Sequence, residues 1–440
     1  MTQEDLSSFN KNFWRFLWSA IIIALSGCLG NIIDAAIVGN LIGEDGVSAI
    51  NLSKTIVQFM FTVSMLLSTG AGMLVGMELG KRQEHRAAYI YSMSIMACLA
   101  FGLFMTLCGI VCPDSITHMI CSNRMLFDST RDYLQPMLLG APTFMLVWAL
   151  GTMIAVDGSP RLVSIAILID NIVNLTCDIV FIKLLGWGIT GSSVATVVGH
   201  IIGIAIMFRH FLYPNNHLRP IFHDTTSAWG SIISQGAPLA VASICLTLLM
   251  FCSNRIILST GGRIAIFAYS VCMNLLQIYN LFLAGTCRTV QSLGAIEVGK
   301  GDNEAFQLVI RKSFRFITWA MIGTCLLVWI FPQAVAKFFG ASEPDIINQT
   351  AHALRVFAIS FIPFCYIYTL MIVYKLYAHH KMALFISFAL SLTVIPVLWL
   401  VARYAPQYMW YSFLIAYIIE GVAIFIIHKI GHIKFILETK

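Results

Sequence analysis

Two carboxylates stand inside stretches of the sequence that are otherwise apolar. Asp34 lies in the first such stretch, and Asp178 lies in a later one, four residues after Asn174. Residues four apart lie one turn apart on the same face of a helix, so Asn174 and Asp178 are expected to point the same way. Thr196 follows in the next apolar stretch, after a glycine-rich break at 186–191. These four side chains are the sharpest candidates for chemistry in the chain.

The four candidates supply two carboxylates, an amide and a hydroxyl, all of which are hard oxygen ligands. Two carboxylates in a low-dielectric surrounding repel each other, and this raises the proton affinity of one of them. Alternatively Na⁺ could sit at Asp34, Asn174 and Asp178, and no other metal is expected. Either way, the residues predict a site that is loaded and unloaded with a cation. For Asn174 and Thr196 alone, a hydrogen bond that joins two helices is the simpler interpretation.

The elements that must position these residues are membrane-spanning helices. Of the 440 residues, 58% are apolar and only 11% are charged, whereas a soluble domain has roughly 25% charged residues. A helix needs about 20 apolar residues to cross ~30 Å of hydrocarbon. Cutting the apolar runs at charged or Pro/Gly-rich breaks predicts twelve spans, at 13–40, 46–78, 87–111, 128–156, 161–183, 190–212, 229–258, 264–297, 306–331, 347–376, 381–403 and 407–430. The fold class is therefore an all-α integral membrane protein.

Lysine and arginine residues are unevenly distributed between the two sets of predicted loops. The termini and the even-numbered loops carry seventeen, and the odd-numbered loops with their flanks carry seven. By the positive-inside rule, both termini are expected in the cytoplasm of a multi-pass plasma (inner) membrane protein. Two termini on the same side require an even number of spans, which agrees with twelve. The small net charge of +6 is thus attributed to membrane orientation, and no nucleic-acid partner is expected.

The second half of the chain repeats landmarks of the first. The sequence Glu-Leu-Gly-Lys at 78–81 recurs as Glu-Val-Gly-Lys at 297–300, and Pro142 recurs as Pro363 after almost the same interval. This shared interval predicts two homologous six-helix bundles of the same orientation, residues 1–220 and 221–440. The shift that brings Lys81 onto Lys300 brings Asp34 onto Ser253, which is no carboxylate. The predicted cation site therefore belongs to the first half.

Further polar residues lie inside the predicted spans, where each ionisable group costs at least ~2.5–3.5 kcal/mol on insertion scales. Asn274, Gln277 and Asn280 form a polar face at i, i+3 and i+6, which a water-filled cavity or helix packing would explain equally well. We take as candidates for lining a cavity Lys54, Asn274, Gln277, Arg288 and Glu420. Asp157, which precedes Gly-Ser-Pro at 158–160, is interpreted as a turn or cap residue. The twelve cysteines have no metal or redox spacing, and no cofactor is expected beyond the coupling ion.

Taken together, these motifs resemble the multidrug and toxic compound extrusion (MATE) family of the multidrug/oligosaccharidyl-lipid/polysaccharide flippase superfamily, over nearly the full chain. The resemblance rests on several short pieces in a fixed order. They are Ile33-Asp34 with Val38-Gly39, residues 76–80, Pro142 with 158–160, Asn174 with Asp178, and the run Gly-Ile-Thr-Gly-Ser-Ser-Val-Ala-Thr at 188–196.

This resemblance implies two six-helix bundles facing each other across a central cavity, with cation-coupled export by alternating access. Asp34, Asn174, Asp178 and Thr196 match, one for one, residues that archaeal and related bacterial members carry in helices one, five and six. Members similar to the cholera-type sodium pumps add acidic residues in helices seven and ten, where this chain has only Arg255 and Arg355. Arg288 is not a family feature, and it would bias a cavity toward zwitterionic or anionic compounds.

The leading hypothesis is a monomeric antiporter in the lipid bilayer that exports amphipathic organic compounds in exchange for Na⁺ or H⁺. A flippase of lipid-linked sugars is the alternative on the same fold, and it would require a strongly basic cavity. A membrane enzyme would require paired Asp-rich Mg²⁺ motifs, which the sequence lacks, so the chain is not expected to be an enzyme. A channel would not combine a two-fold repeat with a one-sided site. The sequence names neither the substrate nor the coupling ion.

Overall fold

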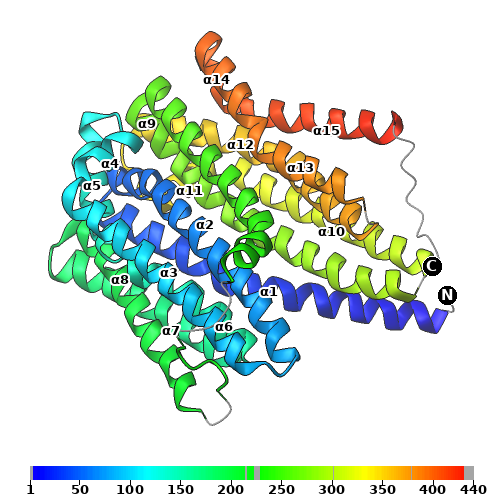
Figure 1. The fold of residues 1–440 in the computed structure, drawn as a ribbon. Coiled ribbons are helices and arrows are strands. Elements are labelled where there is room, and N and C mark those ends of the chain that lie inside the picture. Colours follow the sequence, from blue (N-terminus) through cyan, green and yellow to red (C-terminus); the bar gives the residue numbers. More distant parts are fainter. Residues whose placement is uncertain (1–2, 214–215, 222–227, 301, 378, 431–440) are drawn as a thin grey trace. The chain divides into compact units, whose positions relative to one another are not determined.

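The structure is a computed structural model of the chain, and it describes residues 3–213, 216–221, 228–300, 302–377 and 379–430. Within these ranges every regular element is a helix, as predicted. The elements are labelled in Figure 1. By its internal contacts the chain forms two compact units, Ile37–Arg255 and Met1–Ala36 with Ile256–Lys440. We call them the α2–α8 unit and the α10–α15 unit.

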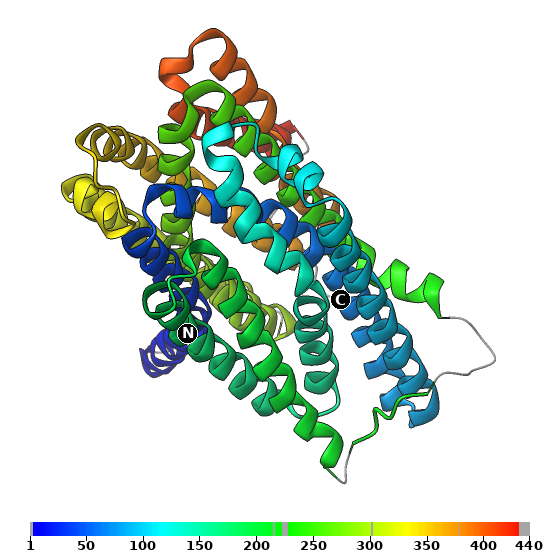
Figure 2. The ribbon, with the colours of Figure 1, turned by 90° about the vertical axis from the view of Figure 1, so that its left-hand side faces the viewer.

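The α2–α8 unit begins with the last residues of α1 and ends in the first part of α9. Its helices are α2 (Glu44–Gly80), α3 (Glu84–Val111), α4 (Pro113–Ile120), α5 (Arg124–Leu139), α6 (Ala141–Val156), α7 (Pro160–Asp178), η1 (Ile179–Leu184), α8 (Gly188–Met207) and η2 (Phe208–Leu212). Side chains from α2, α3 and α6 form its core, where Ala71, Ile90 and Met153 are buried. The antiparallel neighbours α7 and α8, in green in Figure 2, pack against each other along their length.

The α10–α15 unit holds most of α1 (Gln3–Leu41) and the later part of α9 (Trp229–Lys300). Its other elements are α10 (Asn303–Ile330), α11 (Pro332–Phe338), α12 (Pro344–Leu376), α13 (His380–Leu392), α14 (Val394–Tyr404), η3 (Pro406–Tyr411) and α15 (Ser412–Ile430). Aromatic rings fill its interior, where Phe357 packs edge-on against Phe361 and Phe413. Large apolar side chains on its outer helices are exposed, as expected of surfaces that face lipid.

The described helices account for the twelve predicted spans. Nine stretches are long and apolar enough to cross a membrane, and the pair α5–α6, bent by 54°, makes a tenth. One of the nine, Ser243–Gln291, is interrupted at Gly262, whose φ of 64° and ψ of −151° only glycine adopts readily. It therefore holds two spans, and α1, with 39 residues, supplies the twelfth.

The fourth span, predicted at 128–156, is a bent pair of helices. It is broken at Gly140, which ends α5 and precedes α6. Pro142 lies in the first turn of α6, where its missing N–H breaks no helical hydrogen bond. A Cβ on Gly102 of α3 would lie 2.6 Å from the Cα of Pro142, so glycine lets α3 approach this break closely. Periodicity of apolar residues carries no information about such a bend.

The chain passes between the two units inside helices and not in loops. It leaves the α10–α15 unit after Ala36, within α1, and returns to it after Arg255, within α9. The two crossing points are equivalent in the repeat, because the shift that brings Lys81 onto Lys300 also brings Ala36 onto Arg255. Each unit thus contains a helix from the other half of the sequence. The predicted division into residues 1–220 and 221–440 describes the repeat and stays a prediction.

Candidate functional site

Three of the four predicted site residues lie on the helix pair α7–α8. Asn174 and Asp178 share one face of α7, and Thr196 lies on α8. The turn that reverses the chain between them contains Gly186 and Gly188, with φ of 68° and 58°. This left-handed conformation favours glycine, which explains the glycine-rich break in the sequence. Directly after Asp178 the helix widens into the π-helical turn η1, a feature that is frequent at functional sites.

Asn174 and Thr196 are in direct contact. The Nδ2 of Asn174 donates a hydrogen bond of 3.1 Å to the Oγ1 of Thr196. The Thr196 hydroxyl in turn donates to the backbone carbonyl of Ser192 at 3.2 Å. The amide nitrogen of Asn174 therefore points toward α8, and the amide oxygen Oδ1 takes no part in this bond. This bond fixes both the spacing of the helices and the orientation of the amide.

One helical turn away, Asp178 is fully buried, with 0% of its surface exposed. Because α7 and α8 are antiparallel, the step from Asn174 to Asp178 matches the step from Thr196 back to Ser192. Ser192 is also buried, and its hydroxyl has no hydrogen-bond partner among the described residues. Ser192 is not among the residues predicted for the site, although its spacing of four from Thr196 on α8 is a signal in the sequence.

In the other direction along α7, Asp170 lies one turn from Asn174 and is 9% exposed. The facing positions on α8 are Gly199 and Gly203. A Cβ on Gly199 would lie 2.5 Å from Oδ1 of Asp170 and 3.2 Å from Cβ of Asn174. These two glycines leave the space that the Asp170 carboxylate occupies. Asp170, Asn174, Asp178, Ser192 and Thr196 thus form a continuous row of oxygen-bearing side chains, which we call the α7–α8 stripe.

Asp34, the fourth predicted residue, lies in α1 within the α10–α15 unit, two residues before the chain crosses to the other unit. It is half-buried, and its Oδ1 atom is inaccessible to solvent. The structure therefore places the stripe within one unit and assigns Asp34 to the other. Its participation in the same site stays a prediction.

The residues predicted to line a cavity differ in their surroundings. Lys54 on α2 and Gln277 on α9 are half-buried, whereas Arg288 on α9 is exposed. Asn274 is buried and donates to the backbone carbonyl of Ser270 at 3.0 Å, which satisfies its nitrogen within its own helix. Glu420 on α15 is 2% exposed.

Asp157 caps the C-terminus of α6, as its sequence context predicts. The sequence does not reveal its partners. Nε2 of His210, at the end of α8 and η2, lies 2.8 Å from Oδ2 of Asp157, and Nδ1 of His217 lies 2.9 Å from Oδ1. The second ring nitrogen of His210 lies 3.1 Å from the Ser159 hydroxyl. This cluster ties the turn after α6 to the chain that follows η2.

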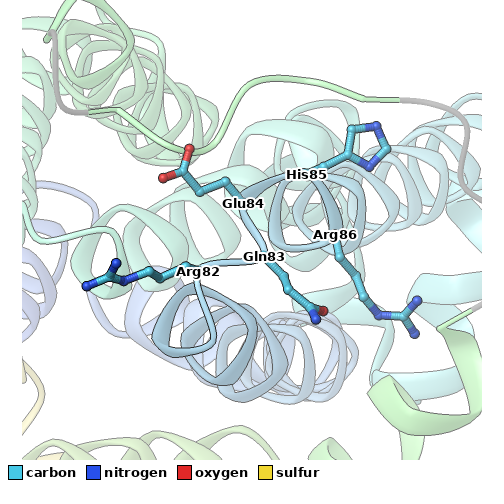
Figure 3. A pocket seen from close by; sticks show the side chains of 5 residues that line it. All are labelled: Arg82, Gln83, Glu84, His85 and Arg86. Carbon is cyan, nitrogen blue, oxygen red and sulfur yellow. The ribbon is translucent and has the colours of Figure 1, made fainter.

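The hollow shown in Figure 3 lies at the turn between α2 and α3, away from the α7–α8 stripe. It measures about 480 Å³ and is lined by Arg82, Gln83, Glu84, His85 and Arg86. The five side chains spread outward from the turn. None of the predicted site residues belongs to this charged surface depression.

A family model and curated relatives both match most of this chain. The model of the MatE family matches residues 20–180 and 238–400. The multidrug export protein MepA of Staphylococcus saprophyticus is 22% identical over 359 residues, which are 80% of this chain and 78% of that protein.

Solved structures share the fold. A multidrug resistance MATE family transporter of the MOP superfamily, in an inward-facing conformation, has a TM-score of 0.83 at 15% identity over 94% of this chain and 97% of its own. The MATE multidrug transporter DinF-BH, solved in a complex, has a TM-score of 0.71 at 19% identity over 94% of this chain and 95% of its own.

Proposed function

We propose, because this chain belongs to the MatE family of membrane transporters, that it exports amphipathic organic compounds in exchange for Na⁺ or H⁺. Its relatives are named multidrug export proteins, which supports this class of cargo. The observation that carries the proposal is the hydrogen bond from Asn174 to Thr196. It holds an amide between two buried carboxylates, Asp170 and Asp178, on one face of α7.

The stripe can bind a cation because it gathers oxygen atoms where water is scarce. An ionised carboxylate at bilayer depth is costly, so Asp178 gains from a proton or a Na⁺ ion. Asn174 and Thr196 add neutral oxygens that can complete the shell of Na⁺ or accept a hydrogen bond from a protonated carboxyl group. We propose that Asp34 joins this site in one of the transporter's conformations.

Coupling follows from competition between two ligands for two conformations. If the cation stabilises one conformation and the exported compound the other, binding of each ligand lowers the population that binds the other. A ligand can shift this equilibrium only by its differential affinity for the two states. For the cation, we expect this difference to arise at Asp178, whose buried carboxylate would hold Na⁺ or H⁺ more tightly in the conformation that excludes water from it.

The proposal includes the membrane arrangement. We place both termini in the cytoplasm and treat the protein as a monomer built from two homologous halves, divided near residue 220. The two family matches support the duplication, since the stretch 20–180 in the first half and the stretch 238–400 in the second are nearly equal in length.

The test is cation-driven transport of a lipophilic dye in everted vesicles that carry the full chain, where efflux runs into the vesicle lumen. Asp178→Asn and Asp34→Asn should each reduce cation-driven efflux by about tenfold or more, by analogy with the loss of a ligand-supporting group. Asp345→Asn, in the exposed first turn of α12, is the matched control and should transport like the unmodified protein. Full activity of Asp178→Asn would overturn the site assignment.

The coupling ion is identified by varying Na⁺ at fixed pH and then pH at fixed Na⁺ in the same vesicles. Dependence on either ion agrees with the proposal and identifies the ion. Efflux that responds to neither ion contradicts it. Movement of a lipid-linked sugar without dye efflux would instead support the flippase alternative.

A further inference from the structure

Glu420 is a buried carboxylate that the proposed cation site does not use. It lies on α15, in the α10–α15 unit, and is 2% exposed. Neither carboxylate oxygen has a hydrogen-bond partner among the described residues. Ionised and unpaired carboxylates are rare in such places, because burial of an uncompensated charge is far more costly than burial of the neutral acid.

The surroundings of Glu420 are aromatic. Glu420 lies on the inward face of α15 with Phe413 and Tyr417, whereas the opposite face is exposed. Phe364 of α12 packs 5.3 Å from the ring of Tyr417, and Tyr269 of α9 stacks 5.9 Å from the ring of Phe413. Tyr417 lies close enough to Glu420, Tyr269 and Cys365 to interact with them electrostatically. All of these residues belong to one unit, so the site is complete within it.

Within the part of the chain that the structure describes, no basic side chain is hydrogen-bonded to this carboxylate. A Cβ on the adjacent Gly421 would lie 3.9 Å from Cδ1 of Ile367. Glu420 therefore lies beside the part of α12 that contains Ile367. At 1.5 Å per residue, Lys375 and Arg355 on α12 lie about 12 Å and 18 Å from Ile367 along the helix. Lys381 at the start of α13 and Arg403 at the end of α14 lie near helix ends. On α9, which reaches this cluster through Tyr269, Arg263 directly follows the break at Gly262 and Arg288 is exposed.

Of the possible ligands, a proton fits the surroundings of Glu420 best. Na⁺ would require several oxygen ligands, and the rings around Glu420 provide few. An organic cation would require open volume, whereas the rings fill the interior by contact with one another. A proton needs neither space nor further ligands, and it converts the carboxylate into the neutral acid that burial favours.

We propose that Glu420 is a second proton-carrying site, located in the α10–α15 unit and independent of the α7–α8 stripe. One proton adds to one carboxylate oxygen when the site opens to one side of the membrane, and the same O–H bond breaks when it opens to the other. No bond to the exported compound is made. This use of the proton in transport rests on the proposed function, whereas protonation of Glu420 does not.

Infrared spectroscopy of the full chain in lipid nanodiscs tests the protonation directly. The carbonyl stretch of a protonated carboxylic acid should be present at neutral pH, should shift in heavy water, and should be lost in Glu420→Gln. Glu78→Gln is the matched control, because Glu78 is buried but paired with Lys81 at 2.9 Å and should contribute no such band. An unchanged band in Glu420→Gln would overturn the proposal.

A conservative variant and a count of transported protons test the assignment of the band and its role in transport. Glu420→Asp retains the acid but moves it, so the band should persist at a shifted frequency, and an unshifted band would also overturn the proposal. In proteoliposomes, Glu420→Gln should move fewer protons per exported molecule than the unmodified protein, and an equal number would contradict the transport role. Asp178→Asn should keep the Glu420 band, so failure of the proposed export mechanism can be told apart from failure of this inference.

Discussion

At the scale of single residues, the Asn174–Thr196 contact does two things with one hydrogen bond. It joins α7 to α8, and it directs the amide nitrogen of Asn174 toward α8, which leaves the amide oxygen out of this bond. Asn174 and Thr196 can therefore link the two helices and also act as ligands of a cation. Removing the hydroxyl tests both, because it leaves the shape of the side chain almost unchanged.

Thr196→Val should leave the protein folded but weaken cation binding by about tenfold, the lower end of the effect expected when the partner of a ligand is removed. The measurement is the Na⁺ concentration or pH at half-maximal efflux in vesicles. Thr152→Val serves as the control, because Thr152 is a half-buried residue of α6 whose hydroxyl donates to the backbone carbonyl of Trp148 in its own helix. Equal midpoints for both variants would assign Thr196 to packing alone.

Asp157 offers a residue-scale test of stability. Asp157→Asn weakens a buried contact with His210 and one with His217. Loss of a partner for a buried polar group costs about 1–3 kcal/mol, so the thermal unfolding midpoint in detergent should fall. Asp345→Asn, which is exposed, should not change it. A midpoint equal to that of the unmodified protein would show that the cluster contributes little.

At the scale of elements, close helix contacts in the α2–α8 unit depend on glycine. A Cβ on Gly70 of α2 would lie 2.1 Å from the carbonyl oxygen of Ile232, and one on Gly236 of α9 would lie 2.0 Å from that of Leu66. The two glycines are reciprocal: each one faces the backbone of the other helix. Small residues at such crossings let the backbones approach, which drives helix association in lipid.

Gly70→Ala and Gly236→Ala should each destabilise the unit by about 1–3 kcal/mol or more, because the added methyl group meets backbone atoms that cannot rotate away. Gly230→Ala is the control within α9, since nothing lies within 4 Å of its Cβ position. Alanine there should be neutral or stabilising by up to about 1 kcal/mol. Thermal unfolding of the three variants in one detergent provides the comparison. Equal stability of Gly236→Ala and Gly230→Ala would contradict the close contact.

The sequence predicts the elements better than it predicts their contacts. Span lengths and breaks are local properties, so the twelve spans and the glycine-rich turn before α8 follow from apolar runs and backbone preferences. The pairing of Asn174 with Thr196 is close to local, because a single short turn joins their helices. Asp157 and its two histidines are 53 and 60 residues apart, and no periodicity connects them. The niche for Asp170 depends on Gly199 and Gly203, whose role only packing reveals.

At the scale of the whole molecule, the units defined by contacts differ from the halves predicted from the sequence repeat, because each unit contains a helix from the other predicted half. Residues 256–300 of α9 belong to the α10–α15 unit, whereas the earlier part of α9, although it also comes from the second half, is packed in the α2–α8 unit with Asn254 bonded to Asn51 at 2.9 Å. Most of α1, from the first half, belongs to the α10–α15 unit. The repeat and the compact units are therefore two different divisions of one chain.

This exchange means that cutting the chain near residue 220 would yield two interlocked fragments. Each fragment would lack one helix of its own compact unit and carry one that completes its partner's. Expressed alone, either fragment should expose unfilled interior and be degraded. Expressed together, the two fragments should co-purify and recover dye efflux, because each supplies the helix that the other lacks. Stable accumulation of either fragment by itself would show that the exchanged helices are dispensable.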